Sequence, residues 1–103
     1  MSLVVVATMV PKPEFRDDVI ATLEDVIARV HAEDAGCEVY SLNEGPDRLV
    51  MIEKWASPED LQAHSTSPAF QALTAALEGK MAQDMDVQIL QPHPAGTPGQ
   101  GLV

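Results

Sequence analysis

The sequence has few basic residues and a single cysteine, and each shortage argues against certain classes of partner or site. Six Lys and Arg stand against sixteen Asp and Glu, so the formal net charge at pH 7 is −10. Nucleic acids and anionic membrane surfaces are bound by clustered Lys and Arg, so we expect neither as a partner. The lone Cys37 can form neither an internal disulfide nor a metal cage, which favours a cytoplasmic location.

Long apolar runs are also missing from the sequence. No segment approaches the ~18 consecutive apolar residues of a membrane-spanning helix, and the first residues lack the features of a secretory signal. Hydrophobic residues make up 46% of the 103 residues, as in an ordinary globular protein. The length fits one domain, which we expect over residues 1–91, followed by a Pro- and Gly-rich tail over 92–103.

The spacing of apolar residues predicts the order strand, helix, strand, strand, helix, strand. Apolar residues at steps of three and four predict a helix over 14–34, which Gly36 is expected to end. Ser57-Pro58 and Ser67-Pro68 predict a start and a restart of the second helical region, because serine caps helices and proline suits their first turn. The expected strands are 3–10, 37–42, 48–55 and, as a short last strand, 87–90.

This order is that of the split βαβ, or ferredoxin-like, arrangement (βαββαβ) of the α+β class, with helices on one face of an antiparallel sheet. The strands over 3–10 and 48–55 are nevertheless apolar on both faces. Something other than the helices must therefore cover the second face: a ligand, a partner sheet, or both. A homodimer that packs sheet against sheet explains the pattern most simply.

Several short motifs in these segments resemble the antibiotic biosynthesis monooxygenase (ABM) family over roughly residues 3–90. They are Gly36-Cys37, Tyr40, Glu53-Lys54-Trp55, His64 and Ser67-Pro68-Ala69-Phe70. The resemblance implies a dimeric α+β barrel. It also implies a monooxygenase that oxidises quinol-like or polyphenolic molecules with molecular oxygen and needs no cofactor or metal. The chemical reason is that a deprotonated phenolate is electron-rich enough to react with oxygen directly.

The resemblance also suggests residues for such a site. His64 is the candidate catalytic residue, because a histidine can take up a proton near neutral pH. Trp55, Tyr40, Phe70 and Met51 are the candidate substrate-binding residues; Trp55 would wall an aromatic substrate and the Tyr40 hydroxyl would stabilise an oxyanion. Each has a structural alternative: a hydrogen-bonded interface histidine for His64, and core packing for the others.

Two departures from the family pattern keep other functions open. Some of these monooxygenases carry an asparagine four residues before the tryptophan, where this chain has Met51. Haem-degrading relatives carry an asparagine in the first strand, where this chain has Ala7, Thr8 and Met9. The alternatives are therefore a non-enzymatic dimer that binds a small ligand or serves a stress response, and, less favoured, a haem-binding relative.

Overall fold

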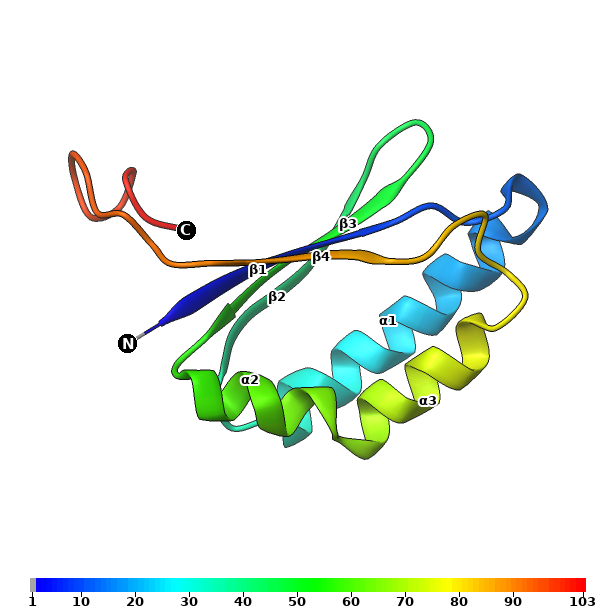
Figure 1. Cartoon of the computed structure of the whole chain (residues 1–103), viewed down its shortest axis with the longest axis horizontal. Helices are drawn as coiled ribbons and strands as arrows, with labels where there is room; N and C mark the ends of the chain where they lie inside the picture. The colour runs from blue at the N-terminus through cyan, green and yellow to red at the C-terminus, as the bar shows by residue number, and fades with distance from the viewer. Residues whose placement is uncertain (1) are drawn as a thin grey trace.

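A computed structural model describes residues 2–103, which form a four-stranded antiparallel sheet with helices packed on one face (Figure 1). The strand order is β2-β3-β1-β4, so β3 and β1 are central. This is the predicted α+β, ferredoxin-like arrangement. The strands are β1 (Leu3–Met9), β2 (Cys37–Glu44), β3 (Leu49–Trp55) and β4 (Asp86–Leu90), and the helices are the 3-10 turn η1 (Pro13–Phe15), α1 (Arg16–Glu33), α2 (Pro58–Ser65) and α3 (Pro68–Leu77).

The two Ser-Pro helix starts are confirmed. The Ser57 hydroxyl accepts a hydrogen bond from the Asp60 amide, and the Ser67 hydroxyl accepts one from the Phe70 amide, so each satisfies a free donor of the first turn. Gly79 follows α3 with a φ of +80°, in the left-handed region that glycine adopts without strain.

Several predicted boundaries differ from the structure by one or two residues, and the end of α1 also differs in its cause. The helix expected over 14–34 begins as the turn η1 and becomes α-helical only at Arg16. The strand expected over 37–42 continues to Glu44, because β3 supplies partners up to that residue. Helix α1 ends at Glu33 with Asp34 as its cap, and Gly36 has no positive φ, so a left-handed glycine does not end this helix.

The core lies between the sheet and the helices. Strand β3 alternates along its whole length, with Leu49, Met51, Glu53 and Trp55 buried on the helix side. The other fully or nearly buried apolar side chains include Val5, Ala7 and Met9 of β1, Val19, Leu23, Val26 and Val30 of α1, and Ala69, Leu73 and Leu77 of α3.

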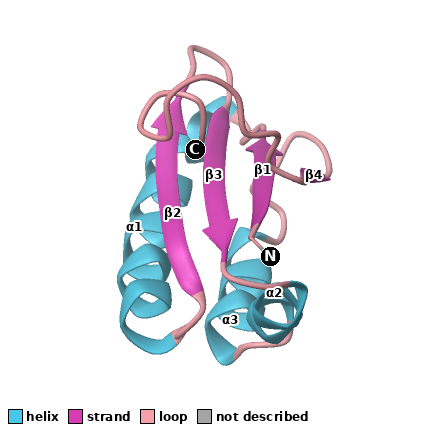
Figure 2. Ribbon diagram, turned by 90° about the vertical axis from the view of Figure 1, so that its left-hand side faces the viewer, coloured by secondary structure: helices cyan, strands magenta, loops and turns pink. Residues whose placement is uncertain are grey.

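The opposite face of the sheet carries no helix, as Figure 2 shows. Val6 lies opposite Ile52 and Thr8 lies opposite Val50 on this face, and all four side chains are partly exposed. Leu90 of β4 lies beside Val4 and is 46% exposed. The structure therefore has the uncovered, apolar second face that the sequence predicts.

Beyond β4, residues 91–103 leave the sheet and form a turn in which the Gly101 amide donates to the Thr97 carbonyl. The division into a domain and a tail stays a prediction. None of the helices within residues 2–103 combines the length and the apolar composition needed to cross a bilayer.

Candidate functional site

His64 lies near the end of α2, on the helix side of the sheet, and is enclosed by aromatic rings. Its side chain is 3% exposed. The Trp55 ring lies 4.5 Å away, tilted by 30°, while Tyr40 and Phe70 each approach at 5.3 Å with nearly perpendicular rings. The structure thus brings together four of the five predicted site residues. His64 lies against each of the three aromatic rings, and Tyr40 also lies against Trp55.

The side chain of Asp34 forms a hydrogen bond with the imidazole of His64. The Nδ1–H group of His64 donates to Asp34 Oδ2 at 2.9 Å, and the Asp34 side chain is only 13% exposed. A carboxylate can only accept, so a neutral His64 carries its proton on Nδ1 and leaves Nε2 as an acceptor. Nε2 has no hydrogen-bond partner within residues 2–103. The arrangement gives His64 the tautomer that a proton acceptor needs.

Glu53 is the second buried polar residue of the core. It is 5% exposed, and its Oε1 accepts a hydrogen bond from the indole N–H of Trp55 at 3.0 Å. Burial raises the pKa of Glu53 from 4.5 to about 7, although the Trp55 hydrogen bond acts in the opposite direction. Near neutral pH this carboxyl can therefore both accept and donate a proton.

Tyr40 lies opposite Glu53 on the neighbouring strand. Burial, and then the nearby charge of Glu53, raise the pKa of Tyr40 well above its usual value, so the phenol keeps its proton and can only donate from its O–H. Burial and then Asp34 raise the pKa of Cys37 to about 11. A thiol with so little thiolate is a poor nucleophile, in agreement with the sequence, which places no basic residue beside it.

Met51 and Phe70 differ in their access to solvent. Met51 is 2% exposed and lies within the core on the same face of β3 as Trp55. Phe70 is partly buried and packs on the edge of that core. A molecule approaching His64 from this side would meet Phe70 before it reached the deeper residues.

A cleft of about 290 Å³ lies between β4 and α2, and we call it the β4–α2 cleft. Its floor is Val5, and its walls include Val87 and Ile89, which are 49% and 60% exposed although they lie beside buried residues of β1. The lining residues are Val5, Pro58, Leu61, Gln62, Ser65, Val87 and Ile89. The cleft exists because no helix covers β4.

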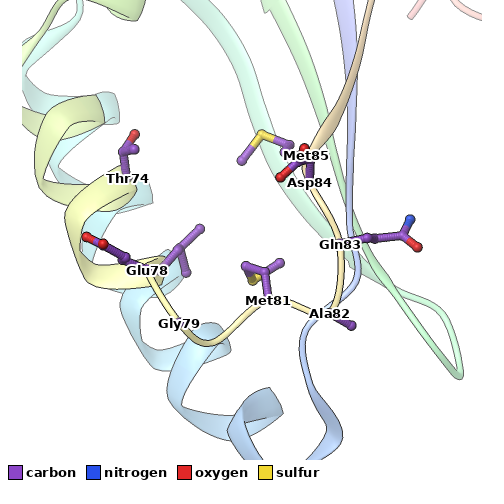
Figure 3. Close-up of a pocket in the computed structure, with 9 residues that line it drawn as sticks. Thr74, Glu78, Gly79, Met81, Ala82, Gln83, Asp84 and Met85 are labelled. Atoms are coloured by element: carbon purple, nitrogen blue, oxygen red, sulfur yellow. The ribbon is translucent and has the colours of Figure 1, made fainter.

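Two other hollows differ from this cleft in size and lining. An open groove of about 520 Å³ lies between the end of α3 and the segment that leads into β4, with Met81 and Met85 among its lining residues (Figure 3). A smaller hollow of about 190 Å³ reaches His64 from outside, but its rim carries the acidic groups of Glu33, Asp34 and Asp60. No group of three His, Cys, Asp or Glu side chains within residues 2–103 is arranged to hold a metal ion.

The sequence reasoning missed the roles of Glu53 and Asp34. Glu53 could have been found, because strand alternation places it on the same face as Met51 and Trp55, where a carboxyl is unexpected. Asp34 could not be found in this way. It lies 30 residues before His64, and only the fold brings the two together.

Comparison with known proteins identifies the family. Residues 2–76, well over half of the chain, match the family model described as "Antibiotic biosynthesis monooxygenase". The chain belongs to the ABM family. This family membership confirms the resemblance that the motifs indicated, and it agrees with the fold.

Curated ABM relatives carry monooxygenase names. The protein named "Putative monooxygenase Rv0793" from Mycobacterium tuberculosis is 32% identical over 90 residues, which cover 85% of this chain and 88% of that protein. "Probable quinol monooxygenase YgiN" from Escherichia coli is 40% identical over 58 residues, covering 56% of this chain and 53% of that protein. The names support a monooxygenase at the level of the family.

Solved structures agree with the ABM fold. The structure of Rv0793 superposes with a TM-score of 0.86 and 25% identity, covering 94% of this chain and all of that chain. A second, from Caulobacter crescentus, is described as a "putative antibiotic biosynthesis monooxygenase" and has a TM-score of 0.83 at 28% identity, covering 86% of this chain and 87% of that chain. The whole sheet and its helices therefore follow a known architecture.

Proposed function

We propose that this ABM-family chain is a monooxygenase that oxidises a quinol-like or polyphenolic small molecule with molecular oxygen and without a cofactor. The observation that carries the proposal is the buried His64, held by Asp34 with Nε2 free to accept a proton, beside the phenol of Tyr40 and the indole of Trp55. The monooxygenase names of the relatives support the same reaction class.

The chemistry needs a base, an oxyanion donor and an apolar environment. His64 Nε2 takes a proton from a substrate hydroxyl, and the Tyr40 O–H donates to the phenolate that forms. The electron-rich ring carbon then forms a C–O bond with oxygen to give a peroxide, whose O–O bond breaks. A quinol and O₂ thus give a hydroxyquinone and water, and the substrate supplies all four electrons.

Substrate access is proposed to run past Phe70. The rings of Trp55, Tyr40 and Phe70 lie against His64, so a substrate must take the place of one of them. Phe70 is the most exposed of the three and sits in the first turn of α3. Displacing it opens the imidazole edge without moving the central strands.

We also propose that the chain forms a homodimer through the uncovered sheet face. Val6, Val50 and Ile52 give this face an apolar centre, and symmetric pairing would remove it from water. A dimer would also cover the part of β4 that carries Leu90.

Oxygen uptake tests the proposed activity. Purified protein incubated with a panel of hydroquinones is expected to consume oxygen faster than autoxidation does. The variant His64→Ala is expected to lose about 100-fold in rate, the scale of a missing general base. His93→Ala, in the tail, is the matched control and should keep the wild-type rate.

Two results would contradict the oxygenase. A rate equal to autoxidation for every quinol would exclude it for this substrate class. Saturable quinol binding without oxygen uptake would instead identify the alternative of a ligand-binding dimer. A Soret band on titration with haemin would support the haem alternative.

A further inference from the structure

We propose that Glu53 is a second proton acceptor of this site and serves the aromatic diol that reaches His64. This inference rests on the proposed function and deepens it, because a quinol carries two hydroxyl groups and must release both protons to become a quinone. His64 takes one proton, and Glu53 takes the other.

The strand register places Glu53 between Val5 and Tyr40. In the ladder between β1 and β3, Glu53 lies directly opposite Val5, the floor of the β4–α2 cleft. Opposite residues of an antiparallel pair share a face, with Cβ atoms about 5 Å apart. Neither Glu53 nor His64 lines that cleft; Trp55 connects them instead, because its indole donates to Glu53 and lies 4.5 Å from the His64 ring. On its other side Glu53 lies opposite Tyr40, whose O–H is the oxyanion donor of the same site.

Packing alone does not call for a carboxyl at this position. The neighbours of Glu53 on the same strand face are Met51 and Trp55, and an apolar residue would continue that row. Buried carboxyls are normally paired with a cation. Glu53 is 5% exposed and forms no salt bridge within residues 2–103; its one side-chain hydrogen bond comes from Trp55. An unpaired carboxyl in a hydrophobic core is a candidate for a functional role.

The free oxygen of Glu53 is open to a ligand. Oε1 accepts from Trp55, whereas Oε2 receives no hydrogen bond from the described residues. No side-chain oxygen or nitrogen of residues 2–103 is both fully enclosed and unpaired, so Oε2 borders space that a water molecule can enter. A substrate hydroxyl can take that position and donate to Oε2.

The surroundings of Glu53 suit reversible proton transfer. Burial raises its pKa to about 7, and the Trp55 hydrogen bond keeps it from rising further. The titratable groups around it are Tyr40 and Cys37 on β2, His64 on α2 and Asp34 at the end of α1. No Lys or Arg within residues 2–103 is paired with any of these groups, so protons can be exchanged without breaking an ion pair to Lys or Arg.

With His64 and Glu53 as the two acceptors, every proton of the reaction is accounted for. The two hydroxyl protons go to His64 Nε2 and Glu53 Oε2 as the ring gives electrons to oxygen. Both protons then return to the outer peroxide oxygen, which leaves as water when the O–O bond breaks. The ring C–H hydrogen ends on the new hydroxyl group of the product. Glu53 thus begins and ends the cycle as a carboxylate.

The test uses Glu53→Gln, which keeps the shape of the side chain and an oxygen that accepts from Trp55. With the quinol that wild type oxidises best, kcat/KM is expected to fall about 100-fold. The limb of the wild-type pH profile with an apparent pKa of about 7 should be absent from the variant. Glu38→Gln, an exposed glutamate on β2, is the matched control and should keep the wild-type profile.

A spectroscopic readout is independent of turnover. Trp55 is the only tryptophan and donates directly to Glu53, so its fluorescence is expected to change with pH around 7. The change should persist in His64→Asn, which removes the imidazole beside the indole, and vanish in Glu53→Gln.

The outcomes separate this inference from the proposed function. If wild type turns over and Glu53→Gln matches it, the oxygenase stands and the role of Glu53 is overturned. A tryptophan signal that is unchanged by Glu53→Gln overturns the role as well. If wild type oxidises no quinol, the proposed function fails, and the role of Glu53 fails with it.

Discussion

At the scale of single residues, the buried carboxyl of Glu53 makes the stability of the fold depend on pH. Its pKa in the folded state is about 7, against 4.5 for the exposed group, so the folded chain binds more protons than the unfolded chain between these values. Stability is therefore highest below about pH 4.5, as far as this group is concerned, and is lost as the pH rises through 7. A shift of this size corresponds to roughly 3 kcal/mol.

The variant Glu53→Gln should not lose stability as the pH rises through 7. At pH 8 we expect its free energy of unfolding to exceed that of wild type by about 3 kcal/mol, because no charge is buried. Near pH 4, where Glu53 is neutral, the two proteins should be equally stable. Urea denaturation at both pH values measures the difference. An exposed-site variant, Glu38→Gln, should show none, and equal stability of Glu53→Gln and wild type at pH 8 would contradict the argument.

The residues of the site were only partly predictable from the sequence. His64, Trp55, Tyr40 and Phe70 do lie together, as the family motifs suggested. Their mutual packing was not predictable, because spacing along a strand or helix places a side chain on a face but does not say what fills the space beside it. The catalytic and binding roles of these residues stay predictions.

At the scale of helices and strands, the residues near a boundary predicted where helices start better than where strands end. Ser57-Pro58 and Ser67-Pro68 fix their helices through hydrogen bonds within four residues, which sequence alone reveals. The extension of β2 to Glu44 depends instead on partners in β3, and the sequence of β2 does not contain that information.

The position of Gly36 suggests that it ends helix α1, but the structure gives a different reason for a glycine there. Its backbone is ordinary, but a Cβ atom there would overlap the side chain of Asp60, which the Ser57 hydroxyl holds by a hydrogen bond of 2.7 Å. Gly36 thus allows the end of α1 to pass close to the first turn of α2. The same passage brings Asp34 to His64.

The variant Gly36→Ala is expected to lower the free energy of unfolding by about 1–3 kcal/mol, the usual cost of forcing an extra methyl into a packed site. Thermal or urea denaturation measures the loss. Gly99→Ala is the matched control, because nothing lies within 4 Å of the Cβ it would add. A Gly36→Ala protein as stable as the control would show that Asp60 moves aside freely.

At the scale of the whole molecule, the uncovered sheet face decides how the chain assembles. Ile52 lies at its centre, opposite Val6 on β1 and Ser41 on β2, and is partly exposed. The apolar strands over 3–10 and 48–55 predicted such a face from the sequence. The sequence could not place β4 beside β1, since nothing in the residues 86–90 specifies a partner some eighty positions away.

The variant Ile52→Glu tests the proposed dimer. Sedimentation at low micromolar concentration is expected to give a dimer for wild type and a monomer for the variant, because two carboxylates would face each other across the interface. Ala75→Glu adds the same charge on an exposed position of α3 and should stay dimeric. A monomeric wild type would refute the proposal directly.

The exposed strand β4 has a consequence for the motions of the molecule. All five of its residues are exposed, and it pairs with β1 alone, so backbone hydrogen bonds hold it with little buried apolar surface. Segments of this kind open locally at a small fraction of the global unfolding free energy. The amide hydrogens of β4 should therefore exchange with solvent far sooner than those of β3. Such local opening of β4 would widen the β4–α2 cleft beside Val5 and leave the hydrophobic core intact.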